Sequence, residues 1–401
     1  MDKALSIFCG LIIFSVAVCH GQEESVVLLR GRIVSATTGE VIGYATIGLA
    51  RNGIETMSNE EGRFTFKIPA AAAGDSIFIS HIGYQSVVLL IHGADTGVKT
   101  IALKERAVEL PGVTVTPGKA LDLIRKAIAR IPDNYPSDPY VSYGFYRFAS
   151  WKEGKVISLS EAIFDIYCPD DNRDHKQFRL IKARADRDEE VFRGLHITQG
   201  RSPEDLMDDD LVSHIHEAPV VGDEEIGKLD FTYNGLIDDA GKPAYEIQFD
   251  QKEGLEEALH KGRLLIDSAS LAFVAFDYSL SPKGLPYWKP QRPGQPRSQG
   301  QTMNISYRRY GGKYYLNLVH RDARWEHINL SGMVLDNQSI YLVTRIDTGK
   351  LRRPGGKAIE SKGAIEGNVR KNSSRQDNFW ENYNAIEADF NVDSVLRVMR
   401  H

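Results

Sequence analysis

The chain has 401 residues, of which 42% are apolar and 26% are charged, and its formal net charge is −5. That length allows two or three domains of ordinary size, and the composition is typical of a globular protein with a sizeable core. The mildly acidic charge argues against a nucleic-acid partner, because binding to a polyanion needs a basic surface.

The N-terminus has the pattern of a secretory signal peptide over residues 1–21. Lys3 precedes an apolar run from Ala4 to Val18, and the small residue Gly21 marks the predicted cleavage site. This run is shorter than the roughly 20 residues that a membrane-spanning helix needs, and no later segment is long and apolar enough to be one. We therefore expect an exported protein, located in the periplasm or associated with the outer membrane.

The same segment allows a second processing route. Residues Val16-Ala17-Val18-Cys19 resemble a lipobox, in which Cys19 is acylated and becomes the new N-terminus. Val18 is bulkier than the residue that usually precedes such a cysteine, so cleavage without lipidation is the favoured prediction. Membrane association would require either this lipidation or a partner protein.

Cysteine usage agrees with a chain that has no disulfide. Two of the three cysteines, Cys9 and Cys19, lie in the signal segment, so Cys168 is the one cysteine expected in the mature protein. Cys168 follows an apolar, strand-like run with no nearby catalytic partner. We expect a packed thiol at a strand end rather than a nucleophile.

Short β-rich runs alternate with turn residues between Val26 and Leu103, at the spacing of a β-sandwich of six or seven strands. Glycines such as Gly39 and Gly62 stand where the predicted turns need a positive φ. The expected strands are 26–34, 45–50, 63–68, 76–82, 85–91 and 98–103.

Five motifs follow one another in this segment: Gly31-Arg32-Ile33-Val34, Thr38-Gly39-Glu40, Ala45-Thr46-Ile47, Asn59-Glu60-Glu61-Gly62-Arg63-Phe64 and Ile82-Gly83-Tyr84. By these motifs residues 26–104 resemble the carboxypeptidase regulatory-like domain, a prealbumin-type β-sandwich common in Gram-negative envelope proteins. Asn59 departs from the family, which often has Asp there. The resemblance implies a fold used for attachment or recognition, not a peptidase, and no His-Glu-x-x-His zinc motif occurs in the chain.

Residues 105–117 have the pattern of a linker strand, and a domain boundary is expected near Gly118. Beyond it, apolar residues recur every three or four positions and predict a helix near 119–131. A second helix is predicted near 203–215, where Ser202 can cap the N-terminus and a proline occupies the first turn.

Many consecutive strand-like runs fill the remainder of residues 118–401. The predicted fold class is mainly β: an N-terminal seven-stranded β-sandwich, then a large curved antiparallel sheet with a few helices (α+β). Several stretches of this second part resemble uncharacterised envelope domains that follow the same sandwich. The curved sheet also resembles the lipoprotein-carrier half-barrel, whose hollow holds acyl chains.

Two stretches contain residue types that can carry chemistry. His214-Ile215-His216, with Glu217 beside it, could hold a cation, but its place at the end of a predicted helix favours a solvated surface. His320, Asp322 and His327 lie on adjoining strand runs, and exposed side chains are expected there as well. No nucleophile elbow, phosphate loop or dinucleotide fingerprint occurs. The sequence therefore predicts no catalytic, cofactor-binding or metal-binding residue, and no cofactor.

Aromatic side chains are the candidates for ligand contact. The proline-rich segment 281–301 contains Tyr287 and Trp288, and Trp325 lies on a later strand. Exposed aromatic rings stack on sugars or pack against a partner protein. We therefore predict Tyr287, Trp288 and Trp325 as possible ligand contacts.

These features favour a non-enzymatic binding or assembly protein of the cell envelope, with an envelope protein, a glycan or a lipid as partner. In this hypothesis the sandwich serves attachment, and the curved sheet holds an apolar or glycan ligand. Two alternatives stay open: an envelope hydrolase acting on glycan or peptide, and a small outer-membrane β-barrel. A deep, apolar-lined hollow in the second domain would favour the carrier, whereas a solidly packed interior would argue against it.

Overall fold

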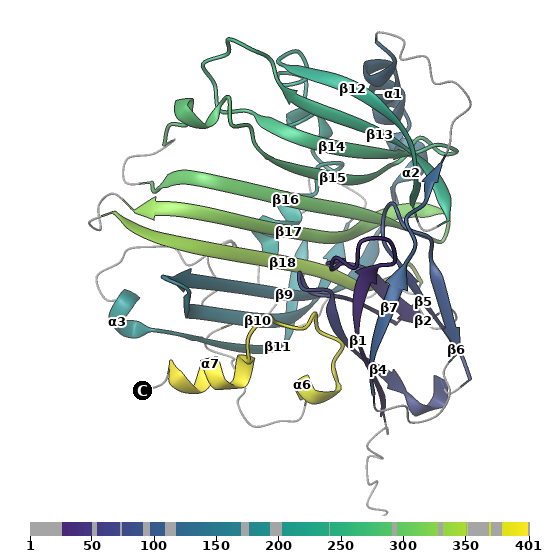
Figure 1. Ribbon diagram of the computed structural model, residues 1–401, viewed down its shortest axis with the longest axis vertical. Coiled ribbons are helices and arrows are strands. Elements are labelled where there is room, and N and C mark those ends of the chain that lie inside the picture. Colours follow the sequence, from purple (N-terminus) through teal and green to yellow (C-terminus); the bar gives the residue numbers. More distant parts are fainter. Residues whose placement is uncertain are drawn as a thin grey trace, which may run out of the picture.

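A small two-sheet unit is followed by one large sheet in this protein (Figure 1). The computed structural model describes residues 26–49, 54–72, 74–90, 97–108, 118–169, 176–192, 203–239, 241–290, 295–327, 332–349, 351, 369 and 379–399. The predicted signal segment and its Cys19 lie outside the described residues. The predicted fold class is confirmed: the chain is mainly β, with a seven-stranded sandwich, a large antiparallel sheet and few helices.

The N-terminal sandwich packs a three-stranded sheet against a four-stranded one. The strands are β1 (Val26–Ser35), β2 (Thr46–Leu49), β3 (Glu55–Met57), β4 (Arg63–Pro69), β5 (Ser76–Ser80), β6 (Val87–Leu90) and β7 (Val98–Leu103). They are ordered β4-β1-β7 and β3-β2-β5-β6. Every second residue of β4 is buried, and Phe64 and Phe66 meet Ile47 and Ile79 of the facing sheet in one core. Burying each such side chain contributes roughly 1.5–3 kcal/mol.

The second unit is an eleven-stranded, wholly antiparallel sheet. Its strands are β8 (Ala107–Val108), β9 (Tyr140–Lys152), β10 (Lys155–Cys168), β11 (Gln177–Arg187), β12 (Leu229–Asp239), β13 (Lys242–Gln251), β14 (His260–Asp267), β15 (Phe273–Leu280), β16 (Arg297–Tyr310), β17 (Lys313–His327) and β18 (Met333–Asp347). Their order is β11-β10-β9-β18-β17-β16-β15-β14-β13-β12-β8. The short β8 comes from the chain between the two units, so its pairing with β12 ties the sandwich to this sheet.

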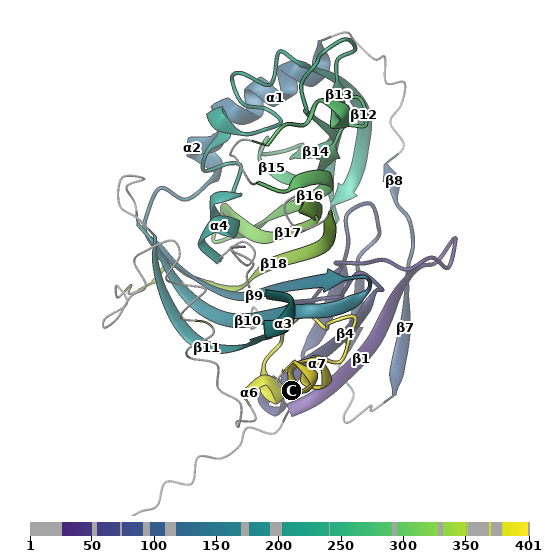
Figure 2. The ribbon, with the colours of Figure 1, turned by 90° about the vertical axis from the view of Figure 1, so that its left-hand side faces the viewer.

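Helices fill the inner face of the curved sheet (Figure 2). The helices are α1 (Lys119–Ala129), α2 (Ile131–Asn134), α3 (Glu189–Phe192), α4 (Pro203–Asp208), α6 (Phe379–Asn382) and α7 (Val392–Val398), and the 3₁₀ turns are η1 (Ala70–Ala72), η2 (Ile215–Glu217) and η3 (Leu285–Tyr287). The Tyr135 hydroxyl donates to the Phe273 carbonyl at 2.7 Å, and the Tyr307 hydroxyl donates to Asp210 at 2.8 Å. Tyr135, Tyr307, Leu206 and Phe276 belong to one continuous apolar cluster. The described part of the inner face is therefore packed as a core.

The outer face of the sheet carries the sandwich and a C-terminal segment, residues 379–399 (Figure 1). Met57 of the sandwich packs there with Ile340 and Leu342 of β18 and with Ile386 of the C-terminal segment. Apolar burial thus holds three parts of the chain together that are far apart in sequence.

The side chain of Asn384 closes the open edge of the sandwich. Its Oδ1 accepts from the Lys67 backbone N–H at 2.7 Å, and its Nδ2 donates to the Lys67 carbonyl at 2.8 Å. One amide therefore takes the place of the neighbouring strand that β4 lacks on this side. The Lys67 ammonium donates to the carbonyls of Trp380 and Tyr383, and burial lowers the pKa of Lys67 to about 8.

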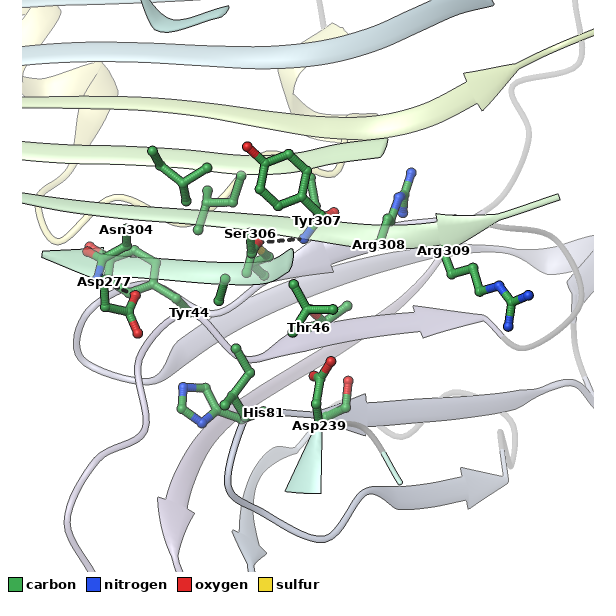
Figure 3. A pocket seen from close by; sticks show the side chains of 18 of the residues that line it. Tyr44, Thr46, His81, Asp239, Asp277, Asn304, Ser306, Tyr307, Arg308 and Arg309 are labelled. Carbon is green, nitrogen blue, oxygen red and sulfur yellow. Dashed lines mark hydrogen bonds between the residues drawn. The ribbon is translucent and has the colours of Figure 1, made fainter. Parts of the chain in front are cut away.

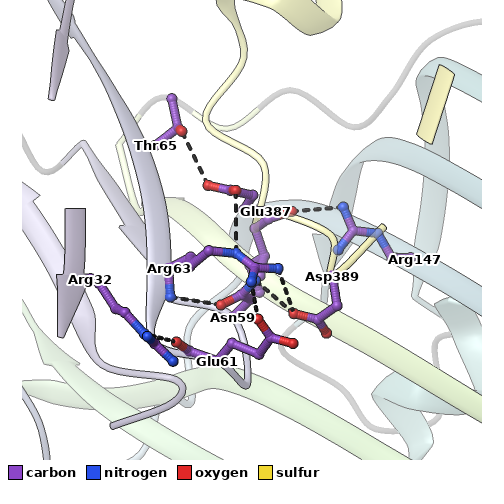
Figure 4. Close-up of polar contacts among 9 residues, drawn as sticks. Arg32, Asn59, Glu61, Arg63, Thr65, Arg147, Glu387 and Asp389 are labelled. Carbon is purple, nitrogen blue, oxygen red and sulfur yellow. Dashed lines mark hydrogen bonds and ion pairs between the residues drawn. The ribbon is translucent and has the colours of Figure 1, made fainter. Parts of the chain in front are cut away.

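Polar side chains continue this junction along the same edge (Figure 4). Asn59 accepts from the Arg63 backbone N–H at 2.7 Å and donates to Asp389 of the C-terminal segment at 2.7 Å. Thr65 donates to Glu387 at 3.1 Å. An aspartate at position 59 would set two carboxylates against each other, which accounts for the asparagine in this chain.

A buried group of three charges lies under the C-terminal segment. Arg147, Glu161 and Arg184 are directly opposite one another on β9, β10 and β11. Glu161 accepts from both arginines at 2.5 Å, and Arg147 also donates to the Ile386 carbonyl at 2.7 Å. Burial opposes ionisation of Glu161, but the two guanidinium groups outweigh burial and lower its pKa.

Replacing Asn384 by alanine tests whether its amide holds the C-terminal segment on β4. The N384A variant leaves both backbone groups of Lys67 without a partner, and we expect a loss of about 1–3 kcal/mol in the free energy of unfolding, measured in urea. Gln299→Ala, at an exposed amide that donates to Glu326, should change it by less than about 0.5 kcal/mol. Equal effects of the two substitutions would contradict this role.

Replacing Glu161 by glutamine tests the buried charges. E161Q leaves the buried Arg147 without a counter-ion and removes one of the two carboxylates paired with Arg184, and we expect a loss of about 3 kcal/mol at neutral pH. Because the folded-state pKa of Glu161 lies below the ordinary 4.5, its contribution is present above that value and is lost as the pH falls through the folded-state pKa. The stability difference between wild type and E161Q should therefore shrink in acid, and a constant difference from neutral pH into acid would contradict the assignment.

Candidate functional site

A row of polar side chains crosses the outer face of the large sheet. The pairing register places six residues directly opposite one another on β12 to β17: Thr232, Gln248, Arg263, Asp277, Asn304 and His320. We call these six residues the polar row. Neighbouring strands lie about 4.8 Å apart, so the row is roughly 24 Å long. Because successive side chains alternate between faces, residues such as Leu264 and Phe276 point into the core instead.

Hydrogen bonds connect the central residues of the polar row. Arg263 donates to Asp277 at 3.0 Å, and Asn304 donates its Nδ2 hydrogen to the other oxygen of Asp277, also at 3.0 Å. Arg263 is further paired with Glu246 at 3.3 Å. The guanidinium of Arg263 is thus shared by two carboxylates, and these side chains are held in defined orientations.

The same geometry positions the ring of His320, which is only 2% exposed. Because the Asn304 amide nitrogen faces Asp277, its oxygen faces Nδ1 of His320, at 3.1 Å. The His320 Nε2 lies 3.2 Å from a carboxylate oxygen of Asp322. Both ring nitrogens of this buried side chain therefore lie within hydrogen-bonding distance of side-chain oxygen atoms. Burial raises the pKa of Asp322, but the hydrogen bond and charge of His320 outweigh it and lower that pKa.

Tyr44 brings the sandwich onto the end of the polar row. Its hydroxyl lies 3.1 Å from His320 Nε2, and the two rings have a centroid separation of 4.5 Å. Tyr44 has a φ of 56°, in the left-handed region that residues other than glycine rarely adopt. Such backbone strain persists only where the surrounding structure enforces it. Burial, followed by the nearby Asp322, raises the Tyr44 pKa, so the hydroxyl stays protonated.

A cleft of about 380 Å³ separates the sandwich from the sheet beside Tyr44 (Figure 3). The sandwich lines one side and the sheet the other, and the lining includes Tyr44, Thr46, His81, Asp239, Asp277, Asn304, Ser306 and Arg308. A second hollow of about 560 Å³ lies over β12 to β16. Both are lined by Asp277 and Asn304, so the polar row leads from beneath the sandwich to the exposed Thr232 and Gln248.

Several ionisable groups in the cleft are perturbed by burial. Glu55 of β3 pairs with Arg308 of β16 and joins the two walls. Burial raises the pKa of Glu55, although Arg308 opposes this. Burial also raises the pKa of Asp239 to about 6, with a smaller contribution from the carboxylate of Asp267.

Two polar atoms of the cleft are unsatisfied. His81 Nδ1 and Arg308 Nε are buried and have no hydrogen-bond partner among the described residues. Burial lowers the pKa of His81, so its imidazole is neutral at neutral pH. Buried polar atoms are nearly always satisfied by protein, water or a ligand. The cleft therefore offers free hydrogen-bonding capacity to a polar molecule.

The aromatic residues predicted as ligand contacts lie elsewhere. Trp288 and Trp325 meet edge to face with a centroid separation of 6.0 Å, and the guanidinium of Arg321 lies 5.7 Å from the Trp325 ring. Tyr287 of η3 is 39% exposed. By the alternation of β17, Trp325 points to the face opposite His320. The structure thus brings two of the three aromatic residues together, away from the cleft, and their role as ligand contacts stays a prediction.

The remaining candidates fall into different environments. His320 and His327 are buried, so the expectation that both are exposed is wrong; Tyr44 and the sheet cover the first. His216 is exposed and lies 3.2 Å from Asp223. Cys168 is a buried thiol at the end of β10, as expected. The described residues contain no group of three or more His, Cys, Asp or Glu that could hold a metal ion.

Sequence reasoning missed the polar row because its members come from six separate strands. Within each strand the signal is a single polar residue in the exposed phase of a period-two pattern, for example Asp277 between Phe276 and Tyr278. Such residues are common on any half-exposed sheet. Only the pairing register aligns them.

Comparisons with known proteins find similar folds at low identity. Residues 29–115 match the model of the CarboxypepD_reg-like domain. A DUF1329 family protein from Desulfovibrio piger is similar in structure, with 10% identity, a TM-score of 0.25 and coverage of 58% of this chain and 95% of that one. A LolA superfamily protein from Nitrosomonas europaea has 10% identity, a TM-score of 0.20 and coverage of 60% and 96%. No inference rests on likenesses this distant.

A search of curated proteins gives no match. No helix among the described segments is long and apolar enough to cross a membrane. The family match covers the seven strands of the sandwich nearly from end to end, together with β8. The N-terminal part of this chain, residues 29–115, is a CarboxypepD_reg-like domain.

Proposed function

We propose that this protein is a non-enzymatic binding protein of the cell envelope that holds a glycan in the cleft between the sandwich and the large sheet. The polar row carries this proposal. It presents amide, carboxylate and guanidinium groups in fixed orientations along one wall of a cleft. A few well-placed polar groups in a concave site are what gives a ligand pocket its specificity.

The distribution of polarity favours a glycan over an apolar ligand. The described inner face of the sheet is packed by large side chains such as Phe276 and Tyr307, which speaks against an acyl chain lying there. The hollows on the outer face are lined by Asp277, Asn304 and other polar residues. Sugar hydroxyls donate and accept hydrogen bonds, so they can pair with both kinds of group.

The extent of the site favours an oligosaccharide. From β12 to β16 the polar row crosses four strand spacings, roughly 19 Å. Thr232 and Gln248, at the open end, are exposed. A linear glycan lying across the strands would therefore contact several row residues at once.

The envelope location and domain division belong to the same proposal. A signal peptide over residues 1–21 would export the chain, the sandwich would occupy 26–104, the linker strand 105–117, and the ligand-binding sheet 118–401. The pairing of β8 with β12 supports a division in which the linker adds to the second domain.

An envelope hydrolase acting on glycan or peptide is the second candidate. The specific observation is the pairing, in one cleft, of a carboxyl with a raised pKa, Asp239, and a neutral imidazole, His81. Perturbed groups in a cleft are typical of active sites, and also of structural networks. Cleavage of a bound glycan or peptide would distinguish a hydrolase from a binding protein.

Binding of labelled tetrasaccharides tests the proposal. We expect the protein to bind at least one of chitotetraose, maltotetraose, mannotetraose and tetragalacturonate, measured by fluorescence anisotropy, without shortening it over a day as followed by mass spectrometry. Asp277→Asn removes the charge that orders Arg263 and Asn304 and should weaken binding at least about tenfold. Asp336→Asn, on the same face but outside both hollows, should bind as wild type. Failure of the whole panel, or equal affinity of D277N and wild type, would refute the site, and cleavage would favour the hydrolase.

The processing of the N-terminus gives a separate prediction. After expression with export in a Gram-negative host, we expect the mature chain to begin at Gln22, because the signal pattern ends at Gly21. Intact-mass measurement distinguishes this product from a chain that begins at an acylated Cys19. A mass equal to the full 401 residues would contradict export.

A further inference from the structure

The sandwich is fixed to the end of β12 by a short turn. The backbone N–H of Gly83 donates to the Asp238 carbonyl at 2.6 Å, and the backbone N–H of Arg106 donates to the Gly83 carbonyl at 3.0 Å. The Arg106 guanidinium lies 3.5 Å from the Asp238 carboxylate. These contacts hold the turn that starts at His81 in one position relative to the sheet.

His81 and Asp239 flank this junction, one from each domain. His81 lies two residues before Gly83, and Asp239 directly follows Asp238. Both side chains line the cleft (Figure 3). The carboxyl group of Asp239 makes no hydrogen bond or ion pair with the side chains of the described residues, and His81 Nδ1 is buried without a partner there. Two polar groups from different domains thus face the same space with hydrogen-bonding capacity to spare.

Given the glycan site proposed above, we propose that the sandwich is itself one wall of that site, and that His81 and Asp239 hydrogen-bond two hydroxyl groups of the sugar that lies deepest in the cleft. The sandwich then contributes to ligand recognition and does not serve attachment alone.

The chemistry of the cleft suits sugar hydroxyl groups at this position. The imidazole of His81 is neutral, and Asp239 presents a carboxyl group to the same cleft. A hydroxyl pair can donate to the carboxylate and pair with the imidazole nitrogen at once.

Three variants test the inference with the tightest-binding tetrasaccharide of the panel. His81→Ala should weaken binding at least about tenfold. His81→Asn should restore most of the affinity, because an asparagine side chain places a polar atom close to the position of Nδ1. His216→Ala, at an exposed histidine remote from the cleft, is the matched control and should bind as wild type. Thermal melting of each variant checks that the sandwich stays docked. If H81A unfolds, the affinity of H81N is used for the test instead.

The pH dependence of binding gives a readout that a merely structural role would not produce. Asp239 has a pKa of about 6 and is faced by Lys242 of β13, Asp267 of β14, Asp238 of its own strand and His81 of the sandwich. A sugar hydroxyl donates a stronger hydrogen bond to the ionised carboxylate than to the carboxylic acid, so the affinity of wild type should rise several-fold from pH 5 to pH 7.5. Asp239→Asn should flatten this rise.

The outcomes separate this inference from the proposed function. If D277N weakens binding while H81A, H81N and D239N bind as wild type at every pH, the sandwich is not a wall of the site and the inference fails, although the glycan site stands. If no tetrasaccharide binds the wild-type protein, the proposed function itself fails, and the inference fails with it. Loss in H81A, recovery in H81N and a flattened pH profile in D239N would together support it.

Discussion

Side chains alternate between the two faces of a β-strand, so the pairing register of the large sheet decides what each face carries. A slip of one residue in β15 would turn Asp277 inward and Phe276 outward, and the core and the polar row would both be lost. Burial of Phe276, Leu264 and their neighbours on the inner face thus fixes the register. The alignment of six polar residues on the outer face follows from that burial and needs no separate explanation.

The two faces of the sheet solve different physical problems. On the inner face α1, α2 and α4 bury apolar surface in the manner of a core. The outer face binds the sandwich and the C-terminal segment through both apolar contacts and ion pairs. Ile340 and Ile386 supply apolar contact, whereas Arg147 and Glu161 form buried ion pairs that tolerate only one arrangement of the segment above them. Ion pairs of this kind add orientation more than net stability.

Docking of the sandwich also creates the candidate site. Tyr44 covers His320, and the turn at His81 contacts the end of β12. Without these two contacts the outer face would be an ordinary solvated sheet. With them, part of the polar row lies in a cleft where water is limited and hydrogen bonds are stronger. Asp239, whose pKa burial raises to about 6, lies where the two domains meet. The candidate site is therefore a property of the domain interface.

The amino-acid sequence by itself determined the fold class, the sandwich and its family, and the packed state of Cys168. These features depend on local patterns: alternation of apolar residues, glycines in turns, and motifs such as Ile82-Gly83-Tyr84. The sequence did not predict the candidate site, because the residues that form it are separated by up to 276 positions, as Tyr44 and His320 are. Exposure of a histidine on a strand depends on what docks above it, which no local pattern encodes. Only the tertiary structure decided that His320 is buried, because only there do Asn304, Asp322 and Tyr44 surround one ring.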